Sequence, residues 1–223
     1  MKLSVVIPVY NEGSFLERTL QKLLHINPYE IIVVDGGSTD NSLDVAKRCN
    51  CEILMTQKSR GNQINKGVLC SRGDVVLILH GDTVLSDKVE SSDFFLAEDE
   101  VGGFFRIKYD SKNFWVKLVE FCANVRSRLH NLPYGDQAIF FKRDIINKIG
   151  SFNDYPFLED LDFVLRLRKV GKIKFVNKNV HVSARKLERK GLLYPLLHSW
   201  RNVIIVFLYF LGFKPEKLIK YYK

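Results

Sequence analysis

Three short apolar runs mark the first part of the chain, at residues 3–8, 31–34 and 75–79. Such short continuous runs are typical of strands that a parallel sheet buries on both faces. Polar or acidic residues follow each run, and an apolar pattern of helical period comes next. This repeated order of strand, loop and helix predicts an α/β fold built on a parallel sheet.

The loops that follow these runs hold the first candidate chemistry. They contain VYNEG at residues 9–13, Asp35 with two glycines after it, and HGDT at residues 80–83. Ligands of open α/β sheets bind at the carboxyl ends of the strands, so all three loops are expected at one functional edge. The glycines permit a tight turn, and residues 38–40 can accept hydrogen bonds from the amides of the next helix.

Other elements can be read from the same patterns. Ser14 and Glu17 have the spacing of a capping box at the start of the first helix. Residues 52–56 predict a strand, and residues 114–129 predict a helix. Apolar residues of helical period at 161–167 predict a later helix that ends near a glycine.

Length and composition favour a single domain. The chain has 223 residues, 46% of them hydrophobic, with no long Pro/Gly/Ser linker and no internal repeat. Its apolar start is broken by Pro8 and lacks a small-residue cleavage site, so it predicts a first strand and not a signal peptide. The four cysteines have no CxxC spacing and are expected to be reduced packing residues.

The net charge of +9 belongs to the C-terminal part. Residues 142–223 carry 18 Lys and Arg against 7 Asp and Glu, a balance of +11. No recognised nucleic-acid-binding motif accompanies this charge, which argues against a nucleic-acid partner. A solvated basic face is the ordinary explanation, and attraction to a membrane surface or to phosphate-bearing substrates is the one we favour.

The segment 192–213 is apolar but too short to span a bilayer. Its longest uninterrupted apolar run, residues 203–211, is far below the roughly 20 residues that a membrane-spanning helix needs. Because aromatic residues lie in it and Lys and Arg flank it, an amphipathic helix in the headgroup region is one interpretation. A helix docked on the protein core is the other.

Several of these segments, taken in order, resemble the family-2 inverting glycosyltransferases. The resemblance covers nearly the whole chain. The motif SARK (residues 183–186) makes a small subgroup of arsenosugar-type glycosyltransferases the nearest match. The matching segments are VVIPVYNE (5–12), VDGGSTD (34–40), RGNQINKG (60–67), HGDT (80–83), GDQ (135–137) and FLED (157–160).

The resemblance implies one GT-A-like domain over residues 1–223. A Rossmann-like parallel half (1–100) is expected to bind the nucleotide-sugar, and a mixed-sheet half (101–190) to hold the acceptor. An amphipathic helical tail (191–223) completes the chain. The implied reaction transfers a sugar, with inversion, from a nucleoside-diphosphate donor, expected to be a UDP-sugar, to an acceptor hydroxyl. The sequence names neither the sugar nor the acceptor.

The family match assigns the nucleotide to the strand-end loops. Asp35 would accept from a base N–H or a ribose hydroxyl, and an aspartate that only shapes the turn is the alternative. Arg60 would grip ribose or phosphate through its planar fork, and a surface arginine is the alternative. The expected nucleotide-binding residues are Pro8, Val9, Tyr10, Asn11, Glu12, Asp35, Arg60 and Gly81.

Asp82 is the expected ligand of a divalent cation, Mn²⁺ or Mg²⁺. The family holds such an ion against the donor diphosphate, and hard cations can complete their shell with phosphates and water. Two residues depart from the family pattern. Gly36 stands where a second acid is frequent, and His80 replaces the first acid of the metal motif. His80 is better explained as a strand-end hydrogen-bonding residue, and His181 as a strand histidine.

By the same resemblance, Asp160 is the general base. A helix dipole favours its ionised form, and helix stabilisation is the alternative role for the same carboxylate. Glu159 would orient the base or meet the acceptor, while Asp162 is expected on another face. The expected acceptor or phosphate contacts are Asp136, Gln137 and Arg185.

Two other functions remain open from the sequence. A non-catalytic nucleotide-sugar- or membrane-binding module would be consistent with the replaced acids. A sugar nucleotidyltransferase would share the fold, but its glycine-rich, arginine-containing loop is missing after the first strand. A dinucleotide oxidoreductase is disfavoured because no GxGxxG follows that strand. The expected location is the cytoplasm, peripherally on the inner membrane face.

Overall fold

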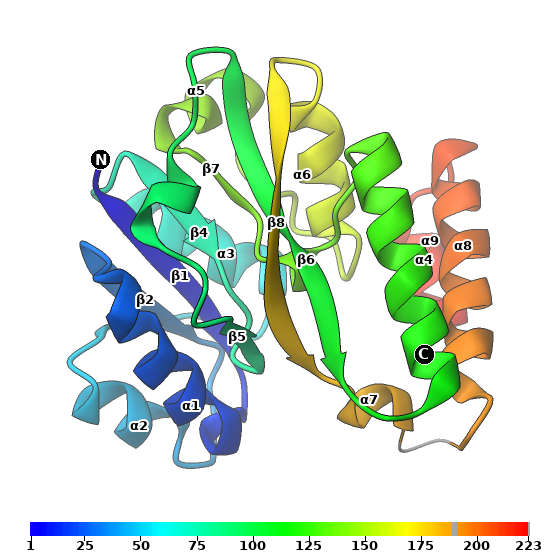
Figure 1. Ribbon diagram of the computed structural model, residues 1–223, viewed down its shortest axis with the longest axis horizontal. Coiled ribbons are helices and arrows are strands. Elements are labelled where there is room, and N and C mark those ends of the chain that lie inside the picture. Colours follow the sequence, from blue (N-terminus) through cyan, green and yellow to red (C-terminus); the bar gives the residue numbers. More distant parts are fainter. Residues whose placement is uncertain (189–190, 223) are drawn as a thin grey trace.

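The computed structural model describes residues 1–188 and 191–222 and has one mixed, eight-stranded sheet at its centre (Figure 1). The strand order is β3-β2-β1-β4-β7-β6-β8-β5, which confirms the predicted α/β class. The strands are β1 (Leu3–Val9), β2 (Glu30–Asp35), β3 (Glu52–Met55), β4 (Val75–Ile78), β5 (Thr83–Leu85), β6 (Glu100–Asp110), β7 (Phe140–Lys142) and β8 (Lys172–Ser183). The α-helices are α1 (Gly13–Leu23), α2 (Ser42–Arg48), α3 (Arg60–Cys70), α4 (Phe114–His130), α5 (Ile146–Ile149), α6 (Glu159–Leu167), α7 (Arg185–Glu188), α8 (Tyr194–Phe210) and α9 (Pro215–Tyr222). Four short 3₁₀ helices are also present among the described residues: η1 (Leu24–Ile26), η2 (Ser91–Phe94), η3 (Gly135–Gln137) and η4 (Arg143–Ile145).

The first four strands are parallel and form the buried centre of the N-terminal half. β1 pairs with β2 and β4, and β2 pairs with β3. Side chains alternate across β1, so Val5 and Ile7 pack with α1 and α2, whereas Val6 packs with α3. Both faces are therefore covered, which explains why these strands are continuous apolar runs.

The second half adds strands of mixed direction. β7 runs antiparallel to β4 and β6, while the long strands β6 and β8 run parallel to each other. β5 returns antiparallel to β8 at the sheet edge. Figure 1 shows α4, α8 and α9 together on the side of the molecule away from α1 and α2. The carboxyl ends of β1 and β4 thus face elements from the second half.

The expected capping box of the first helix is wrong. α1 begins at Gly13, and its preceding residue makes no side-chain capping bond. Instead, the carboxylate of Asp40 accepts from the main-chain N–H of Gly13 (3.0 Å) and from that of Ser42 (3.0 Å). Burial alone would raise the pKa of Asp40, but these hydrogen bonds together lower it. One acid from the second loop therefore fixes the starts of both α1 and α2.

The C-terminal helices dock on the core with one side only. Ile205 of α8 and Leu218 of α9 are buried against Phe157, and the hydroxyl of Tyr209 donates to Oδ1 of Asp162 (2.9 Å). The docked-helix interpretation is therefore met for one side of α8, other apolar side chains of α8 stay exposed, and the headgroup interpretation stays a prediction. Within the described residues, no helix is long and apolar enough to cross a membrane.

The cysteines are free thiols. Cys49 and Cys51 are partly buried against the core, and burial raises the pKa of Cys51 to about 12. Cys70 and Cys122 are exposed, so the packing interpretation is wrong for these two.

Candidate active site

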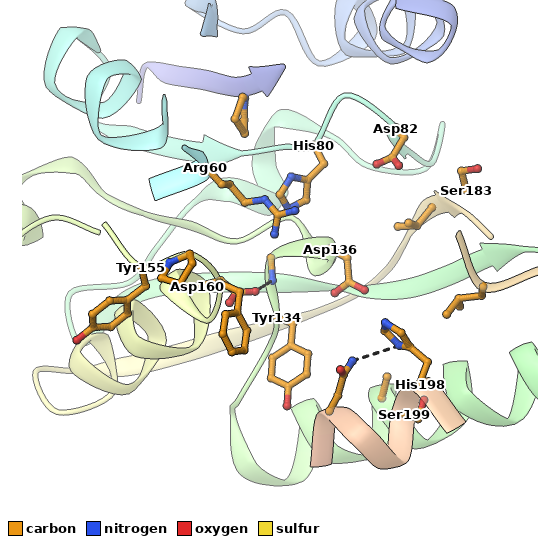
Figure 2. A pocket seen from close by; sticks show the side chains of 18 of the residues that line it. Arg60, His80, Asp82, Tyr134, Asp136, Tyr155, Asp160, Ser183, His198 and Ser199 are labelled. Atoms are coloured by element: carbon orange, nitrogen blue, oxygen red, sulfur yellow. Dashed lines mark hydrogen bonds between the residues drawn. The ribbon is translucent and has the colours of Figure 1, made fainter. Parts of the chain in front are cut away.

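A cavity of about 1660 Å³ lies where the carboxyl ends of the parallel strands meet the second half. Figure 2 shows Arg60, His80 and Asp82 on one side of it, with Asp160, Tyr134 and His198 opposite. A pocket for one drug-sized ligand usually measures roughly 300–1,000 Å³. This cavity therefore has room for two substrates at once.

The strand-end loops supply the N-terminal wall of the cavity. Most of the expected nucleotide-binding residues lie in this wall, together with the expected metal ligand. They are Pro8, Val9, Tyr10, Glu12, Arg60, Gly81 and Asp82. Gln63, from the matching segment 60–67, also lines it, as do Lys58 and Ser59, which lie outside every matching segment.

Asp35 and Asn11 lie behind this wall instead of in it. The buried carboxylate of Asp35 accepts from the main-chain N–H groups of Gly37 (2.7 Å) and Ser38 (2.8 Å) and from the Ser38 hydroxyl. Asn11 adopts a left-handed conformation, and its side-chain oxygen accepts from the N–H of Thr39 (2.8 Å). Asp35 thus shapes its own turn, which is the turn alternative for this residue, and Asn11 ties that turn to the loop after β1.

The structure gives a physical reason for Gly36. A Cβ at this position would lie 3.2 Å from the amide atoms of Gln63. That amide is buried and donates to the carbonyl oxygens of Val9 and Val34, both at 2.8 Å. Gln63 therefore occupies the space in which a second acid would stand, and it ties β1 to β2.

Arg185 lies across two carboxylates of the N-terminal wall. Its guanidinium donates to Glu12 and lies 3.6 Å from Oδ2 of Asp82, and it stacks 4.0 Å from the ring centroid of Phe15. The cavity wall therefore already accommodates a positive charge at Asp82. A divalent cation is consistent with this chemistry, since oxygen ligands suit it. No group of three or more His, Cys, Asp or Glu that could hold a metal occurs among the described residues, so a diphosphate would have to complete the shell.

The two acidic motifs of the second half meet beside His80. Oδ2 of Asp160 accepts from the main-chain N–H of Gly135 at 2.5 Å. A Cβ on Gly135 would lie 2.9 Å from Nε2 of His80 and 3.1 Å from Oδ2 of Asp160. Only a residue without a side chain leaves the imidazole and the carboxylate in these positions. Leu158, just before α6, has a left-handed φ of 66°, a conformation that is costly for a leucine and often found at functional sites.

Glu159 points away from the cavity that Asp160 lines. Its side chain is 1% exposed, and Oε1 lies 3.3 Å from Nη1 of Arg60. Burial raises the pKa of Glu159, the charge of Asp160 raises it further, and Arg60 opposes both effects. Glu159 therefore connects α6 to the start of α3, and Arg60 stands between it and the cavity.

Asp136 lines the cavity, and Gln137 does not. Burial and the charge of Asp160 raise the pKa of Asp136, although a 3.0 Å hydrogen bond from the Tyr109 hydroxyl lowers it. Gln137 is buried and donates from Nε2 to the carbonyl oxygen of Phe105 (3.2 Å) and to the Ser127 hydroxyl (2.9 Å). The Gln137 side chain thus holds the η3 turn against β6 and α4 and does not face the cavity, and its contact with the acceptor stays a prediction.

A further part of the wall comes from α4 and α8, and the sequence predicted neither which residues of α4 line it nor any contribution from α8. Leu118, Val119, Cys122 and Ala123 come from α4, and Leu196, His198, Ser199, Trp200, Asn202 and Val203 come from α8. The helical spacing of apolar residues within 114–129 and 197–211 was the available signal. Periodicity alone does not tell which side of a helix faces a cavity.

Comparison with known proteins gives a consistent assignment. A model of the family described as Glycosyl transferase family 2 matches residues 4–152, about two thirds of the chain. Among curated proteins, the glycosyltransferase GlyG of Streptococcus pneumoniae is 22% identical over 82% of this chain and 71% of its own length.

Solved structures share the fold. The mannosyltransferase PcManGT of Pyrobaculum calidifontis, in complex with GDP-Man and Mn²⁺, has a TM-score of 0.62 at 14% identity, over 90% of this chain and 59% of its own. The glucosyl-3-phosphoglycerate synthase of Mycobacterium tuberculosis, in complex with Mn²⁺, UDP and glucosyl-3-phosphoglycerate, has a TM-score of 0.62 at 18% identity, over 93% and 78%. Because they cover 90% and 93% of this chain, both structural similarities extend over strands of its N-terminal and its C-terminal half.

Proposed function

Because the chain belongs to glycosyl transferase family 2, we propose that it transfers a sugar from a UDP-sugar or a related nucleoside-diphosphate donor to an acceptor hydroxyl, with inversion. One observation carries this proposal. A single cavity, larger than one ligand needs, has the carboxylate of Asp82 in one wall and that of Asp160 in the other. Donor and acceptor can then lie between them.

The donor is assigned to the N-terminal wall. Pro8, Val9, Tyr10, Glu12 and Gly81 would contact the nucleoside, and Arg60 would contact ribose or phosphate through its planar fork. Asp82 would hold Mn²⁺ or Mg²⁺ against the diphosphate. The nucleotide roles of Asn11 and Asp35 stay predictions, and their hydrogen bonds indicate that they act by shaping the loops.

The reaction is proposed as one displacement at the anomeric carbon. The acceptor oxygen forms the new bond to that carbon while the bond to the diphosphate breaks, and the electron pair leaves with the phosphate. Asp160 takes the proton of the acceptor hydroxyl. Arg185 would move from Glu12 and Asp82 to the departing phosphate. When bound, a divalent cation supplies further stabilisation of the leaving group.

Neighbouring groups support the base. Gly135 fixes one carboxylate oxygen of Asp160, and Glu159 fixes the start of α6 through Arg60. Asp136 lines the cavity close to these groups and is assigned to the acceptor. Gln137 contributes indirectly by holding the turn that contains Gly135 and Asp136.

The wider assignments follow the same division. Residues 1–100 form the donor half, residues 101–190 the acceptor half, and residues 191–223 a helical tail that we propose lies peripherally on a cytoplasmic membrane face. Within that tail, Lys223 falls outside the described residues. The SARK motif at residues 183–186 supports placement near the arsenosugar-type subgroup.

Nucleotide-dependent stabilisation tests this function without a known acceptor. Melting with UDP and with GDP, each with and without Mn²⁺, should show a cation-dependent rise in Tm, since ligand at a hundredfold above Kd stabilises by roughly 2.7 kcal/mol. Hydrolysis of a panel of nucleotide-sugars with Mn²⁺ and Mg²⁺ then identifies the donor. Binding without hydrolysis or transfer would favour the non-catalytic module, and absence of any shift would contradict the proposal.

A further inference from the structure

α4 presents a stripe of exposed apolar side chains along its length. Its members are spaced by three or four residues, so they lie on one side of the helix. They are Phe114, Leu118, Phe121, Val125 and Leu129, with exposed fractions from 36% to 71%.

α8 presents a second stripe of the same kind. Its members are Leu197, Trp200, Val203, Ile204, Phe207 and Phe210, with Leu211 directly after the helix, all more than half exposed. α4 and α8 pack against each other, as Figure 1 also shows, so the two stripes belong to neighbouring helices. Exposed apolar surface of this extent is unusual for a protein that meets only water, and it marks an interaction site.

The stripes are continuous with the cavity. Leu118, Trp200 and Val203 are exposed members of the stripes and also line the cavity wall that faces the catalytic carboxylates. An apolar chain that lies along these three residues can therefore have its polar end inside the cavity.

The charge around the stripes selects one kind of partner. Among the described residues of α4, α8, α9 and the segment that joins α8 to α9, seven are Lys or Arg and only Glu120 and Glu216 are acidic. A second copy of this chain would bring the same basic residues together, whereas anionic lipid headgroups would attract them. α8 is also too short to cross a bilayer, so it can lie in the headgroup region.

We propose that the stripes of α4 and α8 rest on an anionic phospholipid bilayer and that the acceptor is an amphiphile of that bilayer. Its hydroxyl-bearing head enters the cavity, and its apolar chain lies along Leu118, Trp200 and Val203. This inference rests on the proposed transferase function and adds the class of acceptor to it. The acceptor need not leave the membrane to be glycosylated.

Trp200 reports on this contact directly. The chain has two tryptophans, Trp115 and Trp200, so Trp115→Phe leaves one reporter, which is 68% exposed in the structure. Vesicles of phosphatidylcholine and phosphatidylglycerol with brominated chains should quench its emission and shift it to the blue. Quenching should weaken with salt, because surface charges are screened over about 8 Å at physiological ionic strength. Emission unchanged by vesicles would overturn the proposal, as would a dimer in which Trp200 is shielded without lipid.

A matched pair of variants distinguishes the effect of the stripe on vesicle binding from the effect of any exposed apolar side chain. Leu197 and Leu69 both lie on helices, are 66% and 68% exposed and do not line the cavity, but only Leu197 belongs to a stripe. Leu197→Glu should weaken vesicle binding about tenfold or more, since the variant loses the burial of a leucine in lipid. Leu69→Glu should change it little. Equal losses in both variants would overturn the assignment to the stripes.

Acceptor length tests the second part of the inference. With the donor identified by hydrolysis, alkyl glycosides from methyl to dodecyl serve as acceptors, and kcat/KM should rise at least tenfold with chain length. Equal transfer to methyl and dodecyl glycosides would overturn the apolar acceptor. The cation-dependent Tm shift with UDP or GDP is measured on the same samples. If the shift persists while lipid and chain-length effects are absent, this inference fails and the transferase function stands; if the shift is absent, the proposed function itself fails.

Discussion

The main-chain N–H of Gly135 donates a 2.5 Å hydrogen bond to Oδ2 of Asp160. This bond joins the η3 turn to the first turn of α6, which are 25 residues apart in the chain. His80, two residues after β4, also lies close to this glycine: a Cβ on Gly135 would be 2.9 Å from Nε2 of His80. The position of the proposed base therefore depends on three separate elements and not on α6 alone.

Gly135→Ala should displace the proposed base without unfolding the protein. The new Cβ would lie 2.9 Å from Nε2 of His80 and 3.1 Å from Oδ2 of Asp160, and both atoms are ends of side chains that can move. Gly135 does not have a positive φ, so alanine is compatible with its backbone. Because a shift of about 1 Å can cost 10²-fold, transfer should fall by about that factor. Steady-state kinetics measure the loss, and an unchanged rate would show that the base tolerates a shift here.

Much of this fold could be predicted from the sequence. The runs at residues 3–8, 31–34 and 75–79 are buried strands because helices cover both faces of the parallel half, and their short length favours strands over helices. The expected strand at 52–56 and helix at 114–129 differ from β3 and α4 by one residue at an end. The capping box at Ser14 failed because Asp40, a residue from another loop, takes the amide of Gly13.

The site was less predictable, because motif letters do not give side-chain direction. Asp160 and Glu159 are adjacent, yet one lines the cavity and the other is buried against Arg60. Asp136 and Gln137 are also adjacent, and again one lines the cavity while the other is buried, here against Ser127. The wall from α4 and α8 carries no motif, and only packing, of α4 on β6 and of α8 on α4, brings it to the cavity.

Arg185→Gln should strengthen Mn²⁺ binding and slow sugar transfer. The guanidinium now neutralises Glu12 and Asp82, so its removal leaves these carboxylates more attractive to Mn²⁺ alone. The same variant loses a cation for the leaving diphosphate, so transfer should fall by roughly 10- to 10³-fold. Electron paramagnetic resonance of free Mn²⁺ and transfer kinetics measure the two effects. Arg185→Lys, which keeps the charge, should lie between the wild type and Arg185→Gln.

Weaker Mn²⁺ binding by Arg185→Gln would contradict this account. It would indicate that Arg185 orients Asp82 for the cation and does not compete with it.

Glu159 should make stability depend on pH. Burial raises its pKa above the ordinary value of 4.5, so the folded state holds this proton more tightly than the unfolded state does. The stabilisation is complete below 4.5 and is lost as pH rises through the folded pKa. Glu159→Gln has no proton to lose. Its Tm relative to the wild type should therefore rise as pH increases above 4.5 and through the folded pKa.

Calorimetry of both proteins across this range measures the difference. Asp136, whose pKa is also raised, is present in both proteins, so its contribution to the pH dependence largely cancels in the difference between the two Tm values. A difference in Tm that stays constant with pH would mean that Arg60 keeps Glu159 ionised throughout.

Asp160 and Asp162 lie on the same helix and provide a matched test of the proposed base. Asp160 lines the cavity, whereas Asp162 accepts from Tyr209 (2.9 Å), Arg166 (2.9 Å) and Asn153 (2.7 Å). Asp160→Asn keeps the shape and an acceptor oxygen for Gly135 but cannot take a proton. Transfer should fall by roughly 10²- to 10⁴-fold, with the cation-dependent Tm shift from UDP retained.

Asp162→Asn should give the reverse result, because it weakens the bond to Tyr209 that holds α6 to α8 and the bond to Arg166 within α6, while leaving the cavity unchanged. Its Tm should fall, since these contacts are charge-assisted and each is worth about 1.5–3 kcal/mol, and transfer by the folded protein should stay near the wild-type value. Near-normal transfer by Asp160→Asn would reduce Asp160 to a helix-stabilising carboxylate, and Asp136, the other acid at the acceptor side of the cavity, would be the next candidate base. Loss of Tm and nucleotide binding together in Asp160→Asn would instead make its bond to Gly135 structural, because chemistry and folding would no longer separate along α6.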